Sequence, residues 1–294
     1  MSHGAPPSRQ RIVIRTVQRW RSQHAQPGAA AEDDVAVEEP LEIRLAGDTF
    51  ATIMRTPGED HFLAAGFLFC EGIIQSLADL GKIAHCGRPT DRGYGNLLDI
   101  APGPGNVLAP ERVAERRGTI VSSACGVCGR ERIDDLTARL GRVPEAEAVN
   151  PALISQSVDA LARAQHSFAR TGAMHGALAL TVRGEELAAG EDVGRHNAVD
   201  KVIGKLLFAG HLTREHSAAR LLAVSGRSSF EIVQKAAAAR IGIVVSVSAP
   251  TSLAIDTAQA LGITLVGFAR GEAFNVYSHP ERLSLSAIHG MERE

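Results

Sequence analysis

The last third of the chain shows the most regular succession of apolar and polar segments. Three short apolar runs have the length and composition of buried strands, and they occupy residues 220–224, 242–247 and 263–268. A helical stretch follows each of the first two runs. Ser228 and Glu231 stand in the spacing of a capping box at the start of the first helix, and Gly262 ends the second. This succession predicts right-handed crossovers and a segment of parallel sheet.

The first half of the chain predicts short strands around one helix. Residues 35–45 and 49–55 have strand character, and Gly47-Asp48 between them is a hairpin signal. Residues 59–71 carry apolar side chains at helical spacing. The segment 91–105 is rich in Gly and Pro and predicts a loop with an edge strand.

These patterns divide the chain into three regions and predict a mixed α/β fold. Residues 1–34 form an N-terminal arm with strand character at 11–18 and a linker-like end at 26–34. Residues 35–118 form a smaller β-rich subdomain, and residues 119–294 form a larger α/β domain.

Composition excludes several classes of function. Lys plus Arg total 31 and Asp plus Glu total 33, so the net charge of -2 argues against a nucleic-acid partner. No apolar run reaches the about 18 residues of a membrane span, so no membrane partner is expected. The N-terminus lacks the apolar core of a secretory signal, although its Arg-rich composition also fits a transit peptide. A reducing cytoplasm is the expected location.

The motif Ser122-Ser-Ala-Cys125-Gly-Val-Cys128-Gly129 is the strongest chemical signal. Two thiols separated by two small residues in a Gly- and Ser-rich turn are accessible to other reactants. A helix predicted from about residue 130 would favour a thiolate at Cys128. A thiolate attacks sulfur, and a second thiol can resolve a mixed disulfide or a persulfide.

Zinc binding is the main alternative for this motif. The other cysteines, Cys70 and Cys86, are not paired in the sequence and are expected to be small buried residues, which weakens a Cys-only zinc site. A zinc deaminase needs H-x-E, but Ala177 occupies the Glu position after His175. We therefore expect no metal ion.

Three further segments carry candidate polar residues. The segment 190–201 places Asp192, Arg195, His196, Asn197 and Asp200 beside a glycine turn, with Asn197 as a helix cap. Arg227 and Ser228 lie in a loop between a strand and a helix, a common anion site.

The third segment, 267–275, leaves the last strand and contains Arg270. Ligands of open α/β sheets gather outside the carboxyl ends of the strands, where both loops are expected. Their shared placement favours a nucleotide-like ligand.

Taken together, these motifs resemble the FdhD family of formate dehydrogenase accessory sulfurtransferases. The matching segments, in order, are EEPLEI (38–43), GFLFCEG (66–72), SACGVCG (123–129), TGAMHG (171–176), EDVGRHNAVDK (191–201), VSGRSSFE (224–231), GFARG (267–271) with Asn275, and HPER (279–282). Ala46-Gly47 departs from the Asn-Gly of many members, which affects only a hairpin turn.

The resemblance implies a function and a set of site residues. Members accept persulfide sulfur from a cysteine desulfurase and pass it to the molybdenum cofactor, bis-molybdopterin guanine dinucleotide, before its insertion into the formate dehydrogenase catalytic subunit. The persulfide carrier maps to Cys125, with Cys128 assisting. The cofactor-binding segment maps to Phe268, Ala269, Arg270, Gly271, Glu272 and Ala273.

The resemblance also implies a fold similar to that of cytidine deaminases in the larger domain, and it is compatible with a homodimer. Two alternatives stay open: a cofactor-binding chaperone whose thiols are incidental, and a zinc protein.

Overall fold

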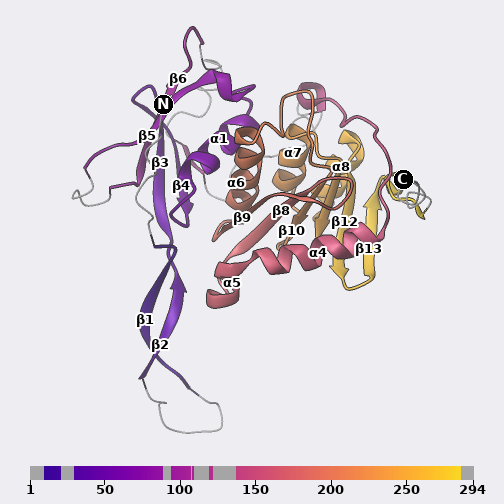
Figure 1. Ribbon diagram of the computed structural model, residues 1–294, viewed down its shortest axis with the longest axis horizontal. Helices are drawn as coiled ribbons and strands as arrows, with labels where there is room; N and C mark the ends of the chain where they lie inside the picture. Colours follow the sequence, from indigo (N-terminus) through magenta and orange to yellow (C-terminus); the bar gives the residue numbers. More distant parts are fainter. Residues whose placement is uncertain are drawn as a thin grey trace, which may run out of the picture.

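The structure, a computed structural model, describes residues 10–20, 30–88, 94–106, 108, 119–121 and 137–285. A six-stranded sheet, a five-stranded sheet and a two-stranded hairpin organise these residues. The two larger sheets lie side by side with helices between and around them (Figure 1). The mixed α/β fold predicted from the sequence is confirmed.

The six-stranded sheet contains the predicted parallel segment. Its strands in spatial order are β13 (Ala273–Ser278), β12 (Thr264–Arg270), β11 (Ile243–Ser246), β10 (Leu221–Val224), β8 (His175–Leu180) and β9 (Glu186–Asp192). Strands β10, β11 and β12 are parallel, and β8, β9 and β13 pair with their neighbours antiparallel. The three parallel strands are buried almost throughout, which explains why their sequences are continuous apolar runs.

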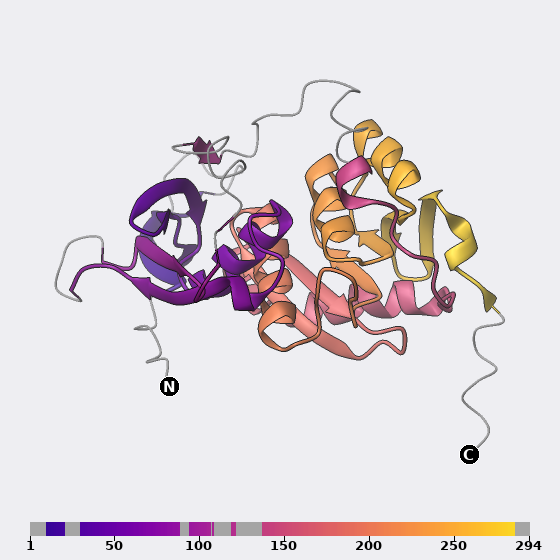
Figure 2. The same cartoon turned by 90° about the horizontal axis from the view of Figure 1, so that it is seen from above.

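Helices cover both faces of this sheet, so the larger unit has three layers. One face packs under α6 (Arg195–Phe208), α7 (Phe230–Ala238) and α8 (Ser252–Leu261). The other face packs against α4 (Ala152–Ala164), which is followed by the short α5 (His166–Thr171). The view from above separates these layers (Figure 2). Because side chains alternate along a strand, Leu222 and Val224 join the first core and Leu221 and Ala223 the second.

The five-stranded sheet forms the smaller unit. Its spatial order is β5 (Leu80–His85), β6 (Leu97–Pro102), β3 (Glu39–Leu45), β4 (Asp48–Arg55) and β7 (Thr119–Val121), with a short 3-10 helix, η1 (Leu77–Asp79), before β5. The predicted hairpin of β3 and β4 is confirmed, with its turn at Ala46-Gly47, one residue before the predicted Gly47-Asp48. Strand β6 pairs on both sides, so the edge strand predicted in this segment is an interior strand.

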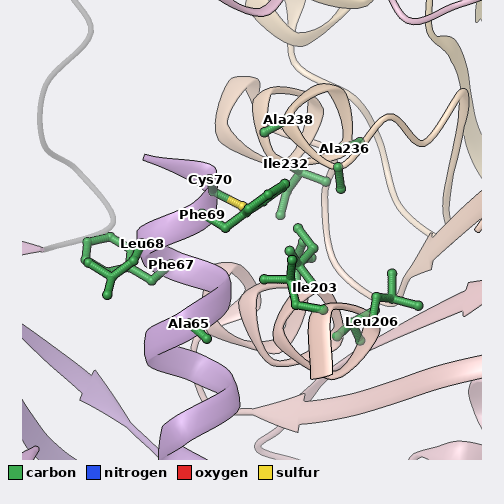
Figure 3. Close-up of a cluster of buried hydrophobic side chains, with 14 of the residues drawn as sticks. Ala65, Phe67, Leu68, Phe69, Cys70, Ile203, Leu206, Ile232, Ala236 and Ala238 are labelled. Carbon is green, nitrogen blue, oxygen red and sulfur yellow. The ribbon is translucent and has the colours of Figure 1, made fainter. Parts of the chain in front are cut away.

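Helix α1 (Asp60–Cys70) joins the two larger sheets through close contact with α6. A side-chain Cβ at Gly66 would collide with the backbone of Asp200, and one at Gly204 would collide with the backbone of Phe62. The two helices therefore meet backbone to backbone. Apolar side chains of α1, α6 and α7, with the sulfur of Cys70 among them, fill the space around this contact (Figure 3).

Strands β1 (Ile12–Gln18) and β2 (Ala30–Ala36) form a hairpin that extends away from the rest of the molecule (Figure 1). The strand predicted at 11–18 is confirmed, whereas the linker predicted at 26–34 is wrong where β2 begins. Arg15 lies opposite Asp33 in the ladder, and Asp34 binds Arg170 of α5 at 2.9 Å. Charged cross-strand neighbours and the long-range ion pair of Asp34 therefore take the place of the apolar alternation that would have marked a strand.

A second 3-10 helix, η2 (Pro280–Arg282), follows β13. In the described ranges, no helix has the length and apolar character needed to cross a membrane. The expected domain limits stay predictions, although β7 pairs with β4 and so belongs to the smaller sheet.

Candidate functional site

The candidate site lies along one edge of the six-stranded sheet. Strands β9, β10, β11 and β12 end there, β8 begins there, and helices α6, α7 and α8 start from the same edge. Helix N-termini carry partial positive charge and free amide donors. The topology therefore concentrates groups that can bind an anion at this edge.

Asp192 holds the start of α6 in place. Its carboxylate accepts hydrogen bonds from the backbone of Gly194 (2.9 Å), the side chain of Asn197 (2.9 Å) and the backbone of Thr56 (3.1 Å), and it pairs with Lys201 at 2.7 Å. The carboxylate is fully buried, and each of its two oxygens has two of these partners. Asp192 is consequently a structural residue, and Gly194 rather than the predicted Asn197 occupies the N-cap of α6.

Asp200, in the same segment 190–201, has its partner in the protein interior. It is buried and pairs with Lys235 of α7 at 2.7 Å. Of the two aspartates, Asp192 therefore lies at the sheet edge and Asp200 in the interior.

His175 begins β8 and is half-buried at the edge. Gly226 leaves room for its ring, because a Cβ there would lie 3.2 Å from His175 Nδ1. Burial, with the positive charge of Arg195 and of other basic groups nearby, lowers the pKa of His175. The ring is therefore a neutral hydrogen-bonding group at neutral pH.

His196, in the first turn of α6, contacts the start of α7. Its Nε2 lies 2.7 Å from Glu231 Oε2 and 3.2 Å from Ser229 Oγ. The capping box predicted from Ser228 and Glu231 is wrong, because His196 binds Glu231 and Ser229 is the N-cap residue. Burial opposes the charge on Glu231, but the hydrogen bond from His196 lowers its pKa overall.

Two buried polar atoms at this edge lack a partner among the described residues. They are the hydroxyl oxygen of Ser228, a residue with no exposed surface, and Nε of Arg195. Buried polar groups are rarely left without a hydrogen bond. Ser228 immediately precedes the N-cap of α7, so the unpaired hydroxyl lies at a helix start suited to an anion.

The predicted cofactor segment, residues 268–273, spans the end of β12, the turn at Gly271 and Glu272, and the first residue of β13, rather than a loop leaving the sheet. The ladder shifts register between Gly267 and Arg270. Phe268 has a left-handed backbone (φ 54°), which is unusual for a bulky residue, and its side chain is 46% exposed. Ala269 is buried, whereas Arg270, Glu272 and Ala273 are exposed and Gly271 has a φ of 53°. Strained backbone of this kind is concentrated at functional sites.

Hydrogen bonds connect the two predicted loops along the edge. Phe268 donates its backbone N–H to the carbonyl of Ser248 (3.1 Å), and the hydroxyl of Ser246 donates to the carbonyl of Gly226 (2.6 Å). The backbone of Thr251 donates to the carbonyl of Ser228 (3.0 Å). The structure thus places both loops on one edge, as predicted from the sheet topology.

The cysteines divide into two groups. Cys125 and Cys128, with most of the helix predicted after them, lie outside the described residues. Cys70 is buried as expected, and burial raises the pKa of its thiol well above the ordinary value; Cys86 is only half-buried. Across the described ranges, no cluster of His, Cys, Asp and Glu could hold a metal ion.

Comparison with known proteins decides the family. The model of the FdhD/NarQ family matches residues 36–284. This chain belongs to the FdhD/NarQ family. Relatives named "Sulfur carrier protein FdhD" include those of Anaeromyxobacter dehalogenans strain 2CP-1, 54% identical over 88% of this chain and 91% of the relative, and of Streptomyces coelicolor, 44% identical over 88% and 92%.

One solved structure shares the fold. The crystal structure of a formate dehydrogenase accessory protein from Desulfotalea psychrophila has a TM-score of 0.69 and 23% identity, covering 94% of this chain and 100% of that one. The family match begins at residue 36, so β1 and nearly all of β2 precede it.

Sequence reasoning missed three contributors to the edge. Thr56 binds Asp192 from the end of β4, and Ser246 and Ser248 support the loops from β11 and the residues after it. Thr56 carried no local signal, because its partner is far along the chain. Ser246 and Ser248, at and just after the end of the buried run at 242–247, were the one available signal, since ligands gather at the carboxyl ends of such strands.

Proposed function

We propose that this chain is a sulfur carrier that serves formate dehydrogenase, with Cys125 as the persulfide carrier. The observation that carries the proposal is the motif SACGVCG at 123–129 in a chain of the FdhD/NarQ family. The names of its relatives, "Sulfur carrier protein FdhD", support it.

In the loading step, the Cys125 thiolate attacks the outer sulfur of a persulfide on a cysteine desulfurase. A bond forms between the two sulfurs, the sulfur–sulfur bond of the donor breaks, and the donor leaves as a thiolate. The exchange needs no external oxidant.

In the release step, the Cys128 thiolate attacks the inner sulfur of the Cys125 persulfide. A disulfide forms between Cys125 and Cys128, and the outer sulfur leaves as hydrosulfide for the acceptor. A dithiol reductant must then restore both thiols before the next cycle.

The acceptor in this proposal is the molybdenum cofactor in its bis-molybdopterin guanine dinucleotide form, bound as a substrate at the sheet edge. Exposed Phe268 offers an aromatic face for a guanine base, and Arg270 beside it offers a planar guanidinium. The unpaired hydroxyl of Ser228 at the start of α7, with Nε of Arg195, offers donors for phosphate oxygens. These groups fit the chemistry of a guanine nucleotide.

Intact mass spectrometry tests the loading step. After incubation with a cysteine desulfurase and L-cysteine, the chain is expected to gain the mass of a sulfur atom. Peptide mapping should place the added sulfur on Cys125. The proposal fails if no sulfur is gained, or if Cys125→Ala gains as much as the unaltered chain.

A second candidate function is a cofactor-binding chaperone without obligatory thiol chemistry. The sheet edge favours this second function, because the groups proposed to bind the nucleotide all lie at that edge and none of them is a cysteine. Complementation separates the two functions. If a strain lacking its own sulfur carrier regains formate dehydrogenase activity with the Cys125→Ala, Cys128→Ala double variant, the chaperone function is correct.

A further inference from the structure

A hollow of about 480 Å³ lies at the opposite edge of the six-stranded sheet. Its walls come from residues 144–147 before α4, the β8–β9 turn at 181–182, the loop 215–220, and Arg240 after α7. Leu180 and Leu221 pair at this end of β8 and β10, whereas the candidate site lies at the other end of both strands. The length of the strands therefore separates the hollow from the candidate site.

Two arginines line the hollow without a carboxylate partner. Arg220 donates through one Nη to the carbonyl of Glu147 (3.0 Å), and its buried Nε has no partner among the described residues. Arg240 donates to the carbonyls of Arg214 (3.1 Å) and Leu140 (2.8 Å). Within the described part of the chain, neither guanidinium forms an ion pair.

A third arginine adds positive charge next to the hollow. Arg282 lies beside Arg220, because a Cβ at Gly242 would be 3.2 Å from an Nη1 atom of each. Arg282 donates to three carbonyls, those of Gly262, Val143 and Pro144. Burial and the charge of Arg282 lower the pKa of Arg220, and the charge of Glu147 opposes them only in part. An anion beside Arg220 would offset both unfavourable effects.

Groups of the opposite charge also line the hollow. Glu145, Glu147 and Glu215 line it with exposed side chains. Three carboxylates repel a ligand with several negative charges, such as a nucleotide, but attract an ammonium group. A ligand with one carboxylate and one ammonium group matches both kinds of charged group that line the hollow.

We infer that this hollow binds a small zwitterion, a free α-amino acid or a short peptide. Its carboxylate contacts Arg220 and Arg240, and its ammonium group lies toward the glutamates. The inference is independent of the proposed function, because it uses none of the cysteines and none of the residues at the candidate site.

Calorimetric titration of the full chain with L-alanine, trialanine, propionate and inorganic phosphate tests this inference. We expect saturable binding of L-alanine or trialanine, and the tighter of the two identifies the source of the zwitterion. Propionate, which lacks the ammonium group, and phosphate should bind at least about tenfold more weakly.

Four variants assign the binding to the hollow. Arg220→Gln and Arg240→Gln should each weaken zwitterion binding about tenfold or more, because each removes a charge-assisted hydrogen bond. Arg183→Gln alters an exposed arginine of the neighbouring turn and should leave the affinity unchanged.

Glu147→Gln should weaken L-alanine binding and strengthen phosphate binding. Because the side chain of Glu147 is exposed, this variant should fold, and it tests the inference even if the two arginine variants do not fold.

Two results would overturn the inference. One is the absence of saturable binding of both zwitterions. The other is phosphate binding as tight as that of the zwitterions, with no response to Glu147→Gln.

Discussion

Lys201 of α6 pairs with Asp192 at the end of β9 across 2.7 Å, and neither side chain has any exposed surface. Lys201 also donates to the carbonyl of Thr56 (3.2 Å), whose own backbone N–H binds Asp192. Thr56 directly follows β4 of the smaller sheet. A single buried ion pair therefore joins the smaller sheet to the edge that carries the candidate site.

Loss of one member of this pair should destabilise the protein strongly. Lys201→Met leaves the Asp192 carboxylate buried without its counter-charge, and we expect the free energy of unfolding to fall by about 3–5 kcal/mol. Urea unfolding followed by circular dichroism measures the change. As a control, Arg170→Met breaks the more exposed pair with Asp34 and should cost at most about 1 kcal/mol. Equal losses in the two variants would contradict the structural role given to the buried pair.

Stability should decline as the solution becomes mildly acidic. Burial lowers the pKa of His175 and of His61 below the ordinary value of 6.5. Below about pH 6.5 the unfolded chain therefore takes up protons that the folded chain resists, so the free energy of unfolding decreases as the pH falls toward the lowered values. His175→Asn should reduce this slope. Titration of the imidazole carbon-bound protons by NMR gives the direct check, and a midpoint for His175 at or above 6.5 would refute the assignment.

Replacement of Phe268 should reduce ligand affinity much more than it reduces stability. Asn tolerates a left-handed backbone better than Phe, so Phe268→Asn should change the free energy of unfolding by less than about 1 kcal/mol. The same variant removes the exposed aromatic face, so its affinity for GDP should fall about tenfold in calorimetric titration. A large loss of stability with unchanged affinity would show that Phe268 serves the fold instead.

Ser228 and Ser246 offer a matched pair of serine variants. Ser228→Ala removes a hydroxyl that has no partner among the described residues, so it should leave stability nearly unchanged and weaken GDP binding. Ser246→Ala removes a hydroxyl that donates to Gly226 and accepts from the backbone of Ser248, so it should cost about 1–2 kcal/mol. Thermal unfolding and calorimetry measure both effects. If Ser228→Ala lowers stability as much as Ser246→Ala, the hydroxyl of Ser228 has a structural partner.

The sequence predicts the larger sheet well because its signals are local. Strands β10, β11 and β12 are buried on both faces, so each appears as an uninterrupted apolar run bounded by polar residues or glycine. Gly262 ends α8 with a left-handed backbone, as predicted from the pattern.

The errors concern residues whose conformation depends on distant partners. Residues 30–36 have no apolar alternation, and they form a strand because β1 pairs with them across the hairpin. Glu231 would suit a capping box, but His196 of another helix binds it. Asn197 has a good capping side chain, yet that side chain binds Asp192 and the carbonyl of Met54. No local pattern contains these contacts.

The position of the candidate site was predictable from the sequence, but the contacts of its individual residues were not. Sheet topology placed the loops of Arg227 and Arg270 on one edge, because parallel strands end together. The different roles of Asp192 and Asp200 were not predictable, since the local sequence does not show that Asp192 pairs with Lys201 and Asp200 with Lys235.

The contact of α1 with α6 at Gly66 and Gly204 has a mechanical consequence. Helices that meet backbone to backbone leave no layer of side chains that could shear between them. We therefore expect α1 and α6 to move together as one rigid unit. A displacement of α1 should therefore be passed on to the start of α6, where Gly194 and His196 lie at the sheet edge.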